Sequence, residues 1–578
     1  MARISRKRSG YMHTHRWTAF GVAAALIALG AAACTDPTVA PTSTVTGANF
    51  YNDLASYQAF LAKVYAGLAV GGQNGGDGST DIQGIDGGFS QYMRLYWELE
   101  ELPTDEAVIA WGDQTLPELN TQGWNPSNNF VQAMYYRVYF QVGMANEFLR
   151  QTTDAELDAR GVGASLKAKV HTYRAEARFL RALAYWHGLD FFGGILTNMI
   201  GYDVAEVREA VERQIATGIV HTSTVYLLRG QVELAEKLAR LSGIPDAKVF
   251  FTNSGTEANE TALLLATVAR KSDQVLAMRQ SYHGRTFGAV SVTSNRSWKN
   301  NSLSPLNVHF LHGADRQLSQ FKGLSDADYI KVCVEDLRHV LSTAAAPDVA
   351  ALIAEPIQGV GGFAMAPDGL FAAYKEVLDE EGILFISDEV QTGWGRTGSA
   401  FFGIQNHGVT PDMMTFAKGL GNGYAVGGLI ARGDLMDGLK ANGVATFGGN
   451  PVSMAAANAT LDYVLDHDLQ ANALRSGTVI IDGLKAAAAR LPIVSEIRGK
   501  GLMFAIELSD PVTGAPAPAL AVRFMEESKK AGLLVGKGGL AGNVLRMAPP
   551  LTLSLDEATE GLGIMINALE VINAEVSA

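Results

Sequence analysis

The segments ILFISDEVQ (residues 383–391) and MMTFAKGLG (residues 413–421) decide the fold of this chain. Each begins with a mainly apolar run, typical of a strand that is buried on both faces, and each then reaches a charged residue, Asp388 or Lys418. These two residues are 30 positions apart, the length of one strand–helix–strand unit. We therefore expect Asp388 and Lys418 to lie side by side at one edge of a parallel sheet.

The same alternation extends over the chain from about residue 200 onward. Short apolar runs alternate with amphipathic helical stretches, a pattern that predicts a mainly parallel sheet covered by helices. The predicted strands are residues 249–251, 275–278, 351–354, 383–386 and 413–416. Polar or glycine-rich clusters follow these strands, so we expect the functional site at their carboxyl ends.

Three features of this edge predict its chemistry. A carboxylate such as Asp388 at the end of a buried strand is costly unless it pairs with a cation, and a protonated pyridine nitrogen would be one. A partly buried lysine such as Lys418 has a lowered pKa and can form a Schiff base. The turn Ser254-Gly255-Thr256 opens a helix after strand 249–251 and offers free N–H groups to a phosphate. Alone, that turn is more often a simple helix cap, but the three features together predict one site.

Several longer segments resemble class III aminotransferases, a family that uses pyridoxal 5′-phosphate (PLP). They occur in family order at residues 252–260, 281–286, 354–359, 387–398, 416–423, 446–451 and 498–503. The resemblance covers about two-thirds of the chain. It implies an α/β type I PLP-dependent transferase fold, with a PLP-binding large domain at residues 195–475 and a smaller α+β domain at residues 476–578. The implied reaction is a ping-pong transamination between amino acids and keto acids, in a homodimer or tetramer.

The resemblance also implies a role for each matching residue. Lys418 is the Schiff-base lysine and moves the substrate proton, and Asp388 pairs with the pyridine nitrogen. The implied cofactor-binding set is Ser254, Gly255 and Thr256 at the phosphate, Thr446 reaching it from a neighbouring subunit, Tyr282 and Val390 on the two ring faces, Gln391 at the ring oxygen, and His283 and Glu355. Arg285 and Arg546 match positions that bind substrate carboxylates, a task suited to the planar guanidinium. Tyr282 could instead be a core aromatic, and each arginine could instead form a surface salt bridge.

One departure from the family pattern bears on the substrate. Acetylornithine, ornithine and 4-aminobutyrate enzymes usually carry Glu after Gln-Gly, where it can pair with the carboxylate-binding arginine. Here Val360 follows Gln358-Gly359. The arginine is then available for an α-carboxylate, as in the alanine–glyoxylate type 2 branch, while a 4-aminobutyrate or acetylornithine enzyme remains the alternative.

The first 190 residues have a different character. Residues 1–33 have the layout of a signal peptide: a basic start, a short apolar run and small residues before Cys34. Cys34 resembles a lipoprotein cleavage and lipidation site, although a plain signal peptide or a wrongly assigned start is an alternative. Residues 50–190 are rich in aromatic residues and read as helices, and within them the apolar positions of residues 171–189 recur at helical spacing.

Residues 34–190 have a second resemblance. They resemble the N-terminal part of SusD-like (RagB/SusD) outer-membrane lipoproteins, which bind glycans beside a TonB-dependent transporter. The stretches that carry the resemblance are residues 95–106, 135–137, 145–150 and 174–183. Neither family is complete, and no Pro-, Ser- or Gly-rich linker separates the two halves near residues 189–195. We therefore expect a chimera joined at a short shared sequence, produced by recombination or by misassembled reads.

Composition excludes some classes of function. The net charge of −13 disfavours nucleic acid as a partner, because a phosphate-binding surface needs clustered Lys and Arg. With only Cys34 and Cys333, neither a disulfide framework nor a Cys-based metal site is expected. The two halves predict different compartments, the cytoplasm for the aminotransferase and the outer membrane for the N-terminus. The hypotheses are thus a transaminase, a glycan-binding lipoprotein, or an inactive PLP fold that serves as a scaffold.

Overall fold

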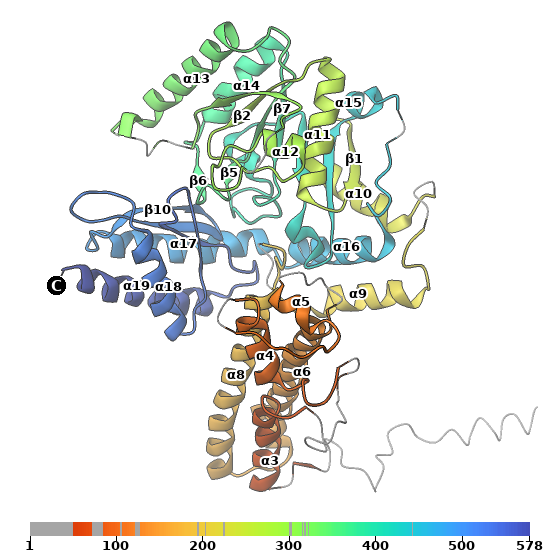
Figure 1. The fold of residues 1–578 in the computed structure, drawn as a ribbon, viewed down its shortest axis with the longest axis vertical. Helices are drawn as coiled ribbons and strands as arrows, with labels where there is room; N and C mark the ends of the chain where they lie inside the picture. The colour runs from red at the N-terminus through yellow and green to blue at the C-terminus, as the bar shows by residue number, and fades with distance from the viewer. Residues whose placement is uncertain are drawn as a thin grey trace, which may run out of the picture. The chain divides into compact units, whose positions relative to one another are not determined.

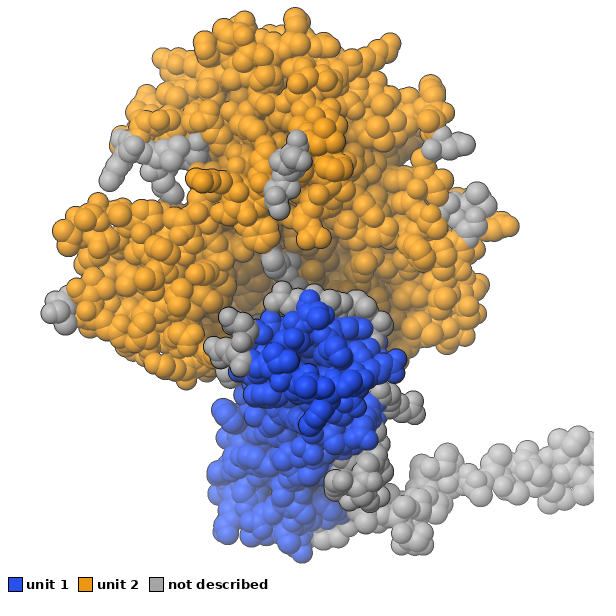
Figure 2. Space-filling view, in the orientation of Figure 1, with its two compact units in different colours: residues 1–192 blue, residues 193–578 orange. Residues whose placement is uncertain are grey.

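The computed structural model describes residues 50–577 except for short gaps, at 52, 72–81, 83–84, 105–106, 122–127, 193–195, 203, 223–225, 300–302, 315, 317–318, 322 and 442. The predicted signal peptide and Cys34 lie outside the described residues, as do the glycines of the predicted junction. The chain divides into two compact units, residues 1–192 and 193–578 (Figure 2). No described helix is both long enough and apolar enough to cross a membrane.

Every regular element described in the first unit is a helix. The helices are α3 (Leu54–Ala66), α4 (Tyr92–Glu101), α5 (Leu116–Asn120), α6 (Asn129–Gln151), α7 (Asp154–Ala159) and α8 (Ala164–Phe192). The long helix α6 begins where the Asn128 side chain accepts hydrogen bonds from the first free backbone N–H groups. Apolar residues of α3, α6 and α8 pack into a shared core, including Val64, Phe148 and Leu180. The predicted helix at residues 171–189 is therefore present, but Phe179 on it is 64% exposed rather than part of the core.

A seven-stranded sheet forms the centre of the second unit (Figure 1). Its strands, in spatial order, are β1 (Ala247–Thr252), β9 (Gly427–Arg432), β8 (Met413–Phe416), β7 (Leu384–Asp388), β4 (Ala351–Ala354), β2 (Gln274–Met278) and β3 (Asn307–Leu311). Neighbours from β8 to β3 are parallel, whereas β9 is antiparallel to both β8 and β1. The sheet is thus mixed, because the β8–β9 connection is too short to hold the crossover helix that a parallel pair needs.

Helices cover both faces of this sheet, which explains why its central strands are mainly apolar. Alternate residues of β4 and β7 point to opposite faces. Ile353 and Ile386 belong to a core beneath α11 (Gly255–Arg270) and α15 (Gly433–Gly438). Leu352 and Phe385 belong to a second core on the opposite face. The other helices of this part are α9 (Ala205–Ala216), α10 (Arg229–Ser242), α12 (Phe287–Ser291), α13 (Asp326–Thr343), α14 (Leu370–Glu381) and α16 (Pro451–Asp466).

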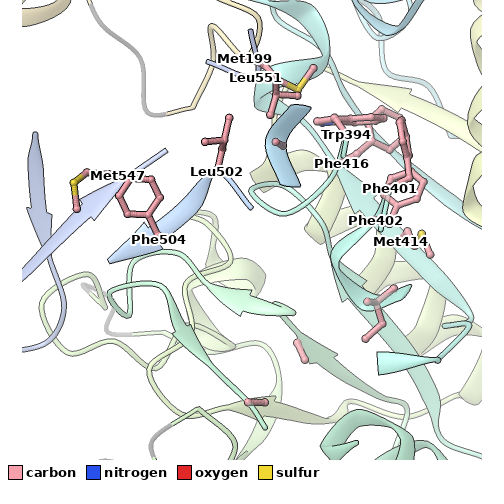
Figure 3. Close-up of a cluster of buried hydrophobic side chains, with 14 of the residues drawn as sticks. Met199, Trp394, Phe401, Phe402, Met414, Phe416, Leu502, Phe504, Met547 and Leu551 are labelled. Carbon is pink, nitrogen blue, oxygen red and sulfur yellow. The ribbon is translucent and has the colours of Figure 1, made fainter. Parts of the chain in front are cut away.

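The C-terminal part holds a second, antiparallel sheet in the order β10 (Val494–Lys500), β11 (Met503–Leu508), β13 (Val544–Met547), β12 (Gly536–Gly538). Helices α17 (Leu469–Ala488), α18 (Pro518–Lys530) and α19 (Leu555–Ser577) accompany it. One apolar cluster runs from the large sheet to this part: Phe416 and Trp394 lie at one end, and Leu502 and Phe504 at the other (Figure 3). The shared core fixes the two sheets relative to each other within the second unit.

Candidate active site

The two strands that decide the fold are neighbours in the sheet. β7 pairs in parallel with β8, and Asp388, the last residue of β7, pairs in register with Thr415. Lys418 follows β8 at the start of the short helix η3 (Lys418–Gly421). Its φ of 50° is in the left-handed region, which turns the chain sharply away from the strand. The structure therefore brings Asp388 and Lys418 to the same sheet edge, as their spacing predicted.

The predicted phosphate turn opens helix α11. Ser254 is its N-cap, and the Ser254 side chain accepts a hydrogen bond from the backbone N–H of Glu257. Gly255 is the first helical residue, and a Cβ placed there would lie 3.0 Å from both methyl carbons of Val390. Glycine thus lets the turn approach Val390 closely, and the free N–H groups of the first turn remain available to an anion.

A cavity of about 480 Å³ brings most of the predicted residues together. This volume is within the usual range for small-molecule sites. The predicted residues that line it are Ser254, Gly255, Thr256, Tyr282, His283, Glu355, Asp388, Val390, Gln391, Lys418 and Arg546. The sequence reasoning missed other lining residues, namely Thr197, Asn259, Trp298 and Tyr424. Of these, Asn259 carried a signal, because it is a polar residue on the otherwise apolar buried face of helix α11.

Two predicted residues do not line this cavity. Arg285 is exposed. Burial raises the pKa of the Tyr282 phenol, and the nearby positive charge of Arg285 opposes this rise. Thr446 lies instead in a neighbouring groove of about 690 Å³, lined also by Glu257, Phe447 and Asn253, the last of which lines the cavity too.

Asp388 is 4% exposed and its carboxylate accepts several hydrogen bonds. Oδ2 is 2.7 Å from the Asn259 amide nitrogen and 2.8 Å from Nδ1 of His283, and Oδ1 accepts from the backbone N–H of Val390 at 3.1 Å. These contacts fix the positions of both carboxylate oxygens. The site thus holds a fixed acid that is suited to pair with a cationic ring nitrogen.

Glu355 is a second buried carboxylate beside the first. Its two oxygens accept the backbone N–H groups of Tyr282 at 2.9 Å and Gly359 at 2.8 Å, so it ties together two loops of the cavity wall. Burial is the main cause that raises the pKa of Glu355 to about 7, with His283 opposing and Asp388 adding to the shift.

Lys418 is the amine of the site. Burial lowers the pKa of its ammonium group, while the nearby charges of Asp388 and Glu355 act in the opposite direction. A lowered pKa leaves more of the amine neutral, which a nucleophile or proton carrier requires.

Arg546 reaches the cavity from strand β13 of the second sheet. Its Nη1 donates to the carbonyl of Gly359 at 2.6 Å, and burial lowers the pKa of its guanidinium group. Its Nε is buried without a hydrogen-bond partner among the described residues. The guanidinium therefore retains donor capacity for an acidic ligand.

These residues suit PLP. The cavity joins an amine, a buried carboxylate and a helix N-terminus, which match the aldehyde, the ring nitrogen and the phosphate of that cofactor. Oε1 of Gln391 and Nε2 of His283 are also buried and have no partner within the described part of the chain, so they can bind polar atoms of a ligand. No group of three His, Cys, Asp or Glu suited to a metal ion is found among the described residues.

Comparison with known proteins agrees with this geometry. The model of the family "Aminotransferase class-III" matches residues 169–569, more than half of the chain. "Alanine–glyoxylate aminotransferase 2 homolog 2, mitochondrial" from Arabidopsis thaliana is 38% identical over 375 residues, which are 64% of this chain and 76% of the relative. An acetylornithine aminotransferase from Corynebacterium efficiens is 36% identical over 394 residues, 67% of this chain and 89% of the relative.

A solved structure of a transaminase has a similar fold. An amine transaminase from an uncultivated Pseudomonas species, in a PLP-bound form, superposes with a TM-score of 0.61 at 32% identity, covering 66% of this chain and 89% of the other. The fold, the cavity and these matches lead to one conclusion: the chain belongs to the class III aminotransferase family, and it is a transaminase.

Proposed function

We propose that the cavity binds PLP and transfers an amino group from an alanine-like amino acid to a keto acid such as glyoxylate. The observation that carries the proposal is the convergence of Lys418, Asp388 and the Gly255 turn on one cavity. Class III aminotransferases depend on PLP, which when bound draws off the electrons released as the substrate Cα loses its proton. The protein's own groups bind and orient this ring and move the proton.

Each residue has a distinct part. Nζ of Lys418 is the nucleophile and then carries the proton, while Asp388 holds the ring nitrogen in its cationic form. The first turn of α11 and the hydroxyl groups of Ser254 and Thr256 bind the phosphate. Tyr282 and Val390 enclose the ring from its two faces. Gln391, His283 and Glu355 also line the cavity, and they would complete the cofactor-binding set and restrain the ring.

The carboxylate of the substrate binds to Arg546. Arg285, which is exposed and does not line the cavity, is the second candidate for this contact. Arg546 has no acidic hydrogen-bond partner among the described residues, because Val360 occupies the position where related enzymes carry Glu. An α-carboxylate can then replace Gly359 as the partner of the guanidinium, and it gains a charge-assisted, bidentate contact.

This reasoning favours an alanine–glyoxylate type of enzyme over a 4-aminobutyrate or acetylornithine type. Single-turnover rates of the first half-reaction with alanine and with 4-aminobutyrate distinguish the two. We expect alanine to react faster, and a clear preference for 4-aminobutyrate would overturn the branch assignment.

Thr446 supports a homodimer or a tetramer. The family positions a threonine at the phosphate of the neighbouring subunit, and Thr446 belongs to a groove whose Phe447 is 61% exposed. A second copy that covers this groove would bring Thr446 to the other active site. Sedimentation analysis tests this point, because a monomer that retains full activity would contradict it.

Absorbance tests the function as a whole. The purified chain with PLP should absorb at about 400–430 nm through the bond with Lys418, and alanine should bleach this band. A protein without the band, or with a band that no amino donor bleaches, would be an inactive scaffold.

A second proposal concerns the first unit. We propose that residues 34–190 are a SusD-like fragment, behind a signal peptide at residues 1–33 and a lipidated Cys34, joined to aminotransferase domains at residues 195–475 and 476–578. The helices of this unit support it, as do exposed aromatic side chains such as Trp97 and Tyr136, which suit glycans.

The two halves require different tests. A single sequencing read across the codons for residues 185–200 with both flanks intact would exclude misassembly. Fractionation of cells that express the whole chain would distinguish a cytoplasmic transaminase from an outer-membrane lipoprotein beside a TonB-dependent transporter.

A further inference from the structure

Asn259 is a buried amide that neither the motif roles nor the proposed reaction explains. It lies one turn into helix α11, after the phosphate turn, and is 1% exposed. Its helix neighbours Ala258, Ala262 and Leu263 are buried and apolar. Burying an amide in such surroundings is costly unless all its hydrogen bonds are satisfied, so its partners indicate why it is there.

The partners of Asn259 come from three other elements. Its Nδ2 donates to Oδ2 of Asp388 at 2.7 Å and to the backbone carbonyl of His283 at 2.8 Å. Its Oδ1 accepts from the hydroxyl of Thr415 at 2.6 Å. A carboxylate and a carbonyl can only accept, so the amide has a single possible orientation. Thr415 is itself 0% exposed, so its hydroxyl group cannot donate to bulk water in place of Asn259.

This arrangement links the three parts of the cofactor site. Asn259 is part of the helix that begins at the phosphate turn, Asp388 ends strand β7, and Thr415 is on strand β8, three residues before Lys418. The distance between the phosphate turn and Asp388 is thereby fixed by one side chain. The same side chain orients the carboxylate oxygen that also meets His283. Because Asn259 and His283 hold the Asp388 carboxylate in place, it needs little rearrangement when it pairs with a cation.

We propose that Asn259 is a positioning residue: it holds Asp388, and through Thr415 the strand of Lys418, in register with the phosphate turn. The proposal rests on the proposed PLP-dependent function. Asn259 would touch no substrate atom. It would affect the contact between Asp388 and the ring nitrogen of the cofactor. Because that contact controls proton removal, the rate should change and substrate binding should not.

Asn259→Asp is the sharpest test, because it changes one atom type and keeps the shape. The new carboxylate would place an acceptor against Oδ2 of Asp388 and the carbonyl of His283, where two donors are needed. We expect kcat for the alanine half-reaction to fall about 10- to 100-fold, the usual loss when a residue that orients a ligand-binding side chain is changed. KM for alanine should change less than about 3-fold, since Arg546 is untouched.

A spectroscopic readout separates positioning from a loss of structure. A weaker contact at the ring nitrogen removes nearby positive charge, so the pH midpoint of the absorbance band at about 400–430 nm should rise by roughly one unit. Asn472→Ala is the control, because the Asn472 amide likewise donates two hydrogen bonds, but to the backbone carbonyls of Leu551 and Leu553 rather than to Asp388. It should leave the midpoint and kcat unchanged.

Thr415 provides a second pair of variants in case Asn259→Asp does not fold. Thr415→Val removes the hydroxyl and keeps the shape, and we expect it to lower kcat and raise the midpoint in the same direction but less. Thr415→Ser keeps the donor and should behave as the wild type. If the wild type shows the band and alanine bleaches it, yet both Asn259→Asp and Thr415→Val keep kcat and the midpoint, the positioning role is wrong. If the wild type itself shows no band, the proposed function fails instead.

Discussion

Gly255→Ala tests whether the phosphate turn and Val390 enclose the cofactor. The new Cβ would lie 3.0 Å from both methyl carbons of Val390, closer than side chains normally pack. Val390 also lines the cavity, so a shift of its side chain would change the cavity wall. Overpacking by one methyl group costs about 1–3 kcal/mol. If that cost appears in binding, PLP affinity should fall roughly 5- to 150-fold.

The assay is titration of the PLP-free protein with PLP, followed at the absorbance band of about 400–430 nm. Val390→Ala removes both methyl carbons that the new Cβ would meet. Added to the Val390→Ala background, Gly255→Ala should therefore cost little, which gives a large coupling energy in the double-mutant cycle.

Gly561→Ala is the control, because a Cβ at Gly561 in helix α19 meets no heavy atom within 4 Å. It should leave PLP binding unchanged and add helix stability. Unaltered PLP affinity in Gly255→Ala, or the same loss with and without Val390→Ala, would refute the close approach as the reason for the glycine.

Three further predictions concern single residues. Lys418→Ala should bring alanine turnover below detection while PLP-free stability is retained, and measurable turnover in this variant would contradict its role. Burial raises the pKa of Glu355 to about 7, above its unfolded value, so its contribution to stability is present at low pH and is lost as pH rises toward 7. Between about pH 5 and 7, the unfolding free energy of the PLP-free wild type should thus decline more steeply than that of PLP-free Glu355→Gln. Equal slopes in the two proteins would exclude Glu355 as the source of the decline. Arg396 is buried and donates to the carbonyls of Leu502 at 3.1 Å and Pro549 at 2.8 Å. Arg396→Met should therefore lower the free energy of unfolding in urea. An unchanged unfolding midpoint would show that these two hydrogen bonds do not stabilise the fold. The expected loss is about 2 kcal/mol.

Local sequence patterns were sufficient for the elements that carry the site. Apolar runs bounded by polar residues predicted five strands that the structure contains, because a strand covered by helices on both faces is mainly apolar. The order of the sheet was not predictable in the same way. β9 reverses direction because of a short connection, and pairing between distant segments such as β1 and β9 depends on the whole core.

The sequence by itself determined which residues could do the chemistry: Lys418 and Asp388 are set at the ends of adjacent strands by their spacing along the chain, and the phosphate turn is set by the helix that it opens. Only the tertiary structure decided how the side chains of the site contact one another. Asn259 and Thr415 are far apart in sequence, and they meet because helix α11 packs on the large sheet. Such contacts depend on packing between distant segments, which has no local periodicity for a sequence to reveal.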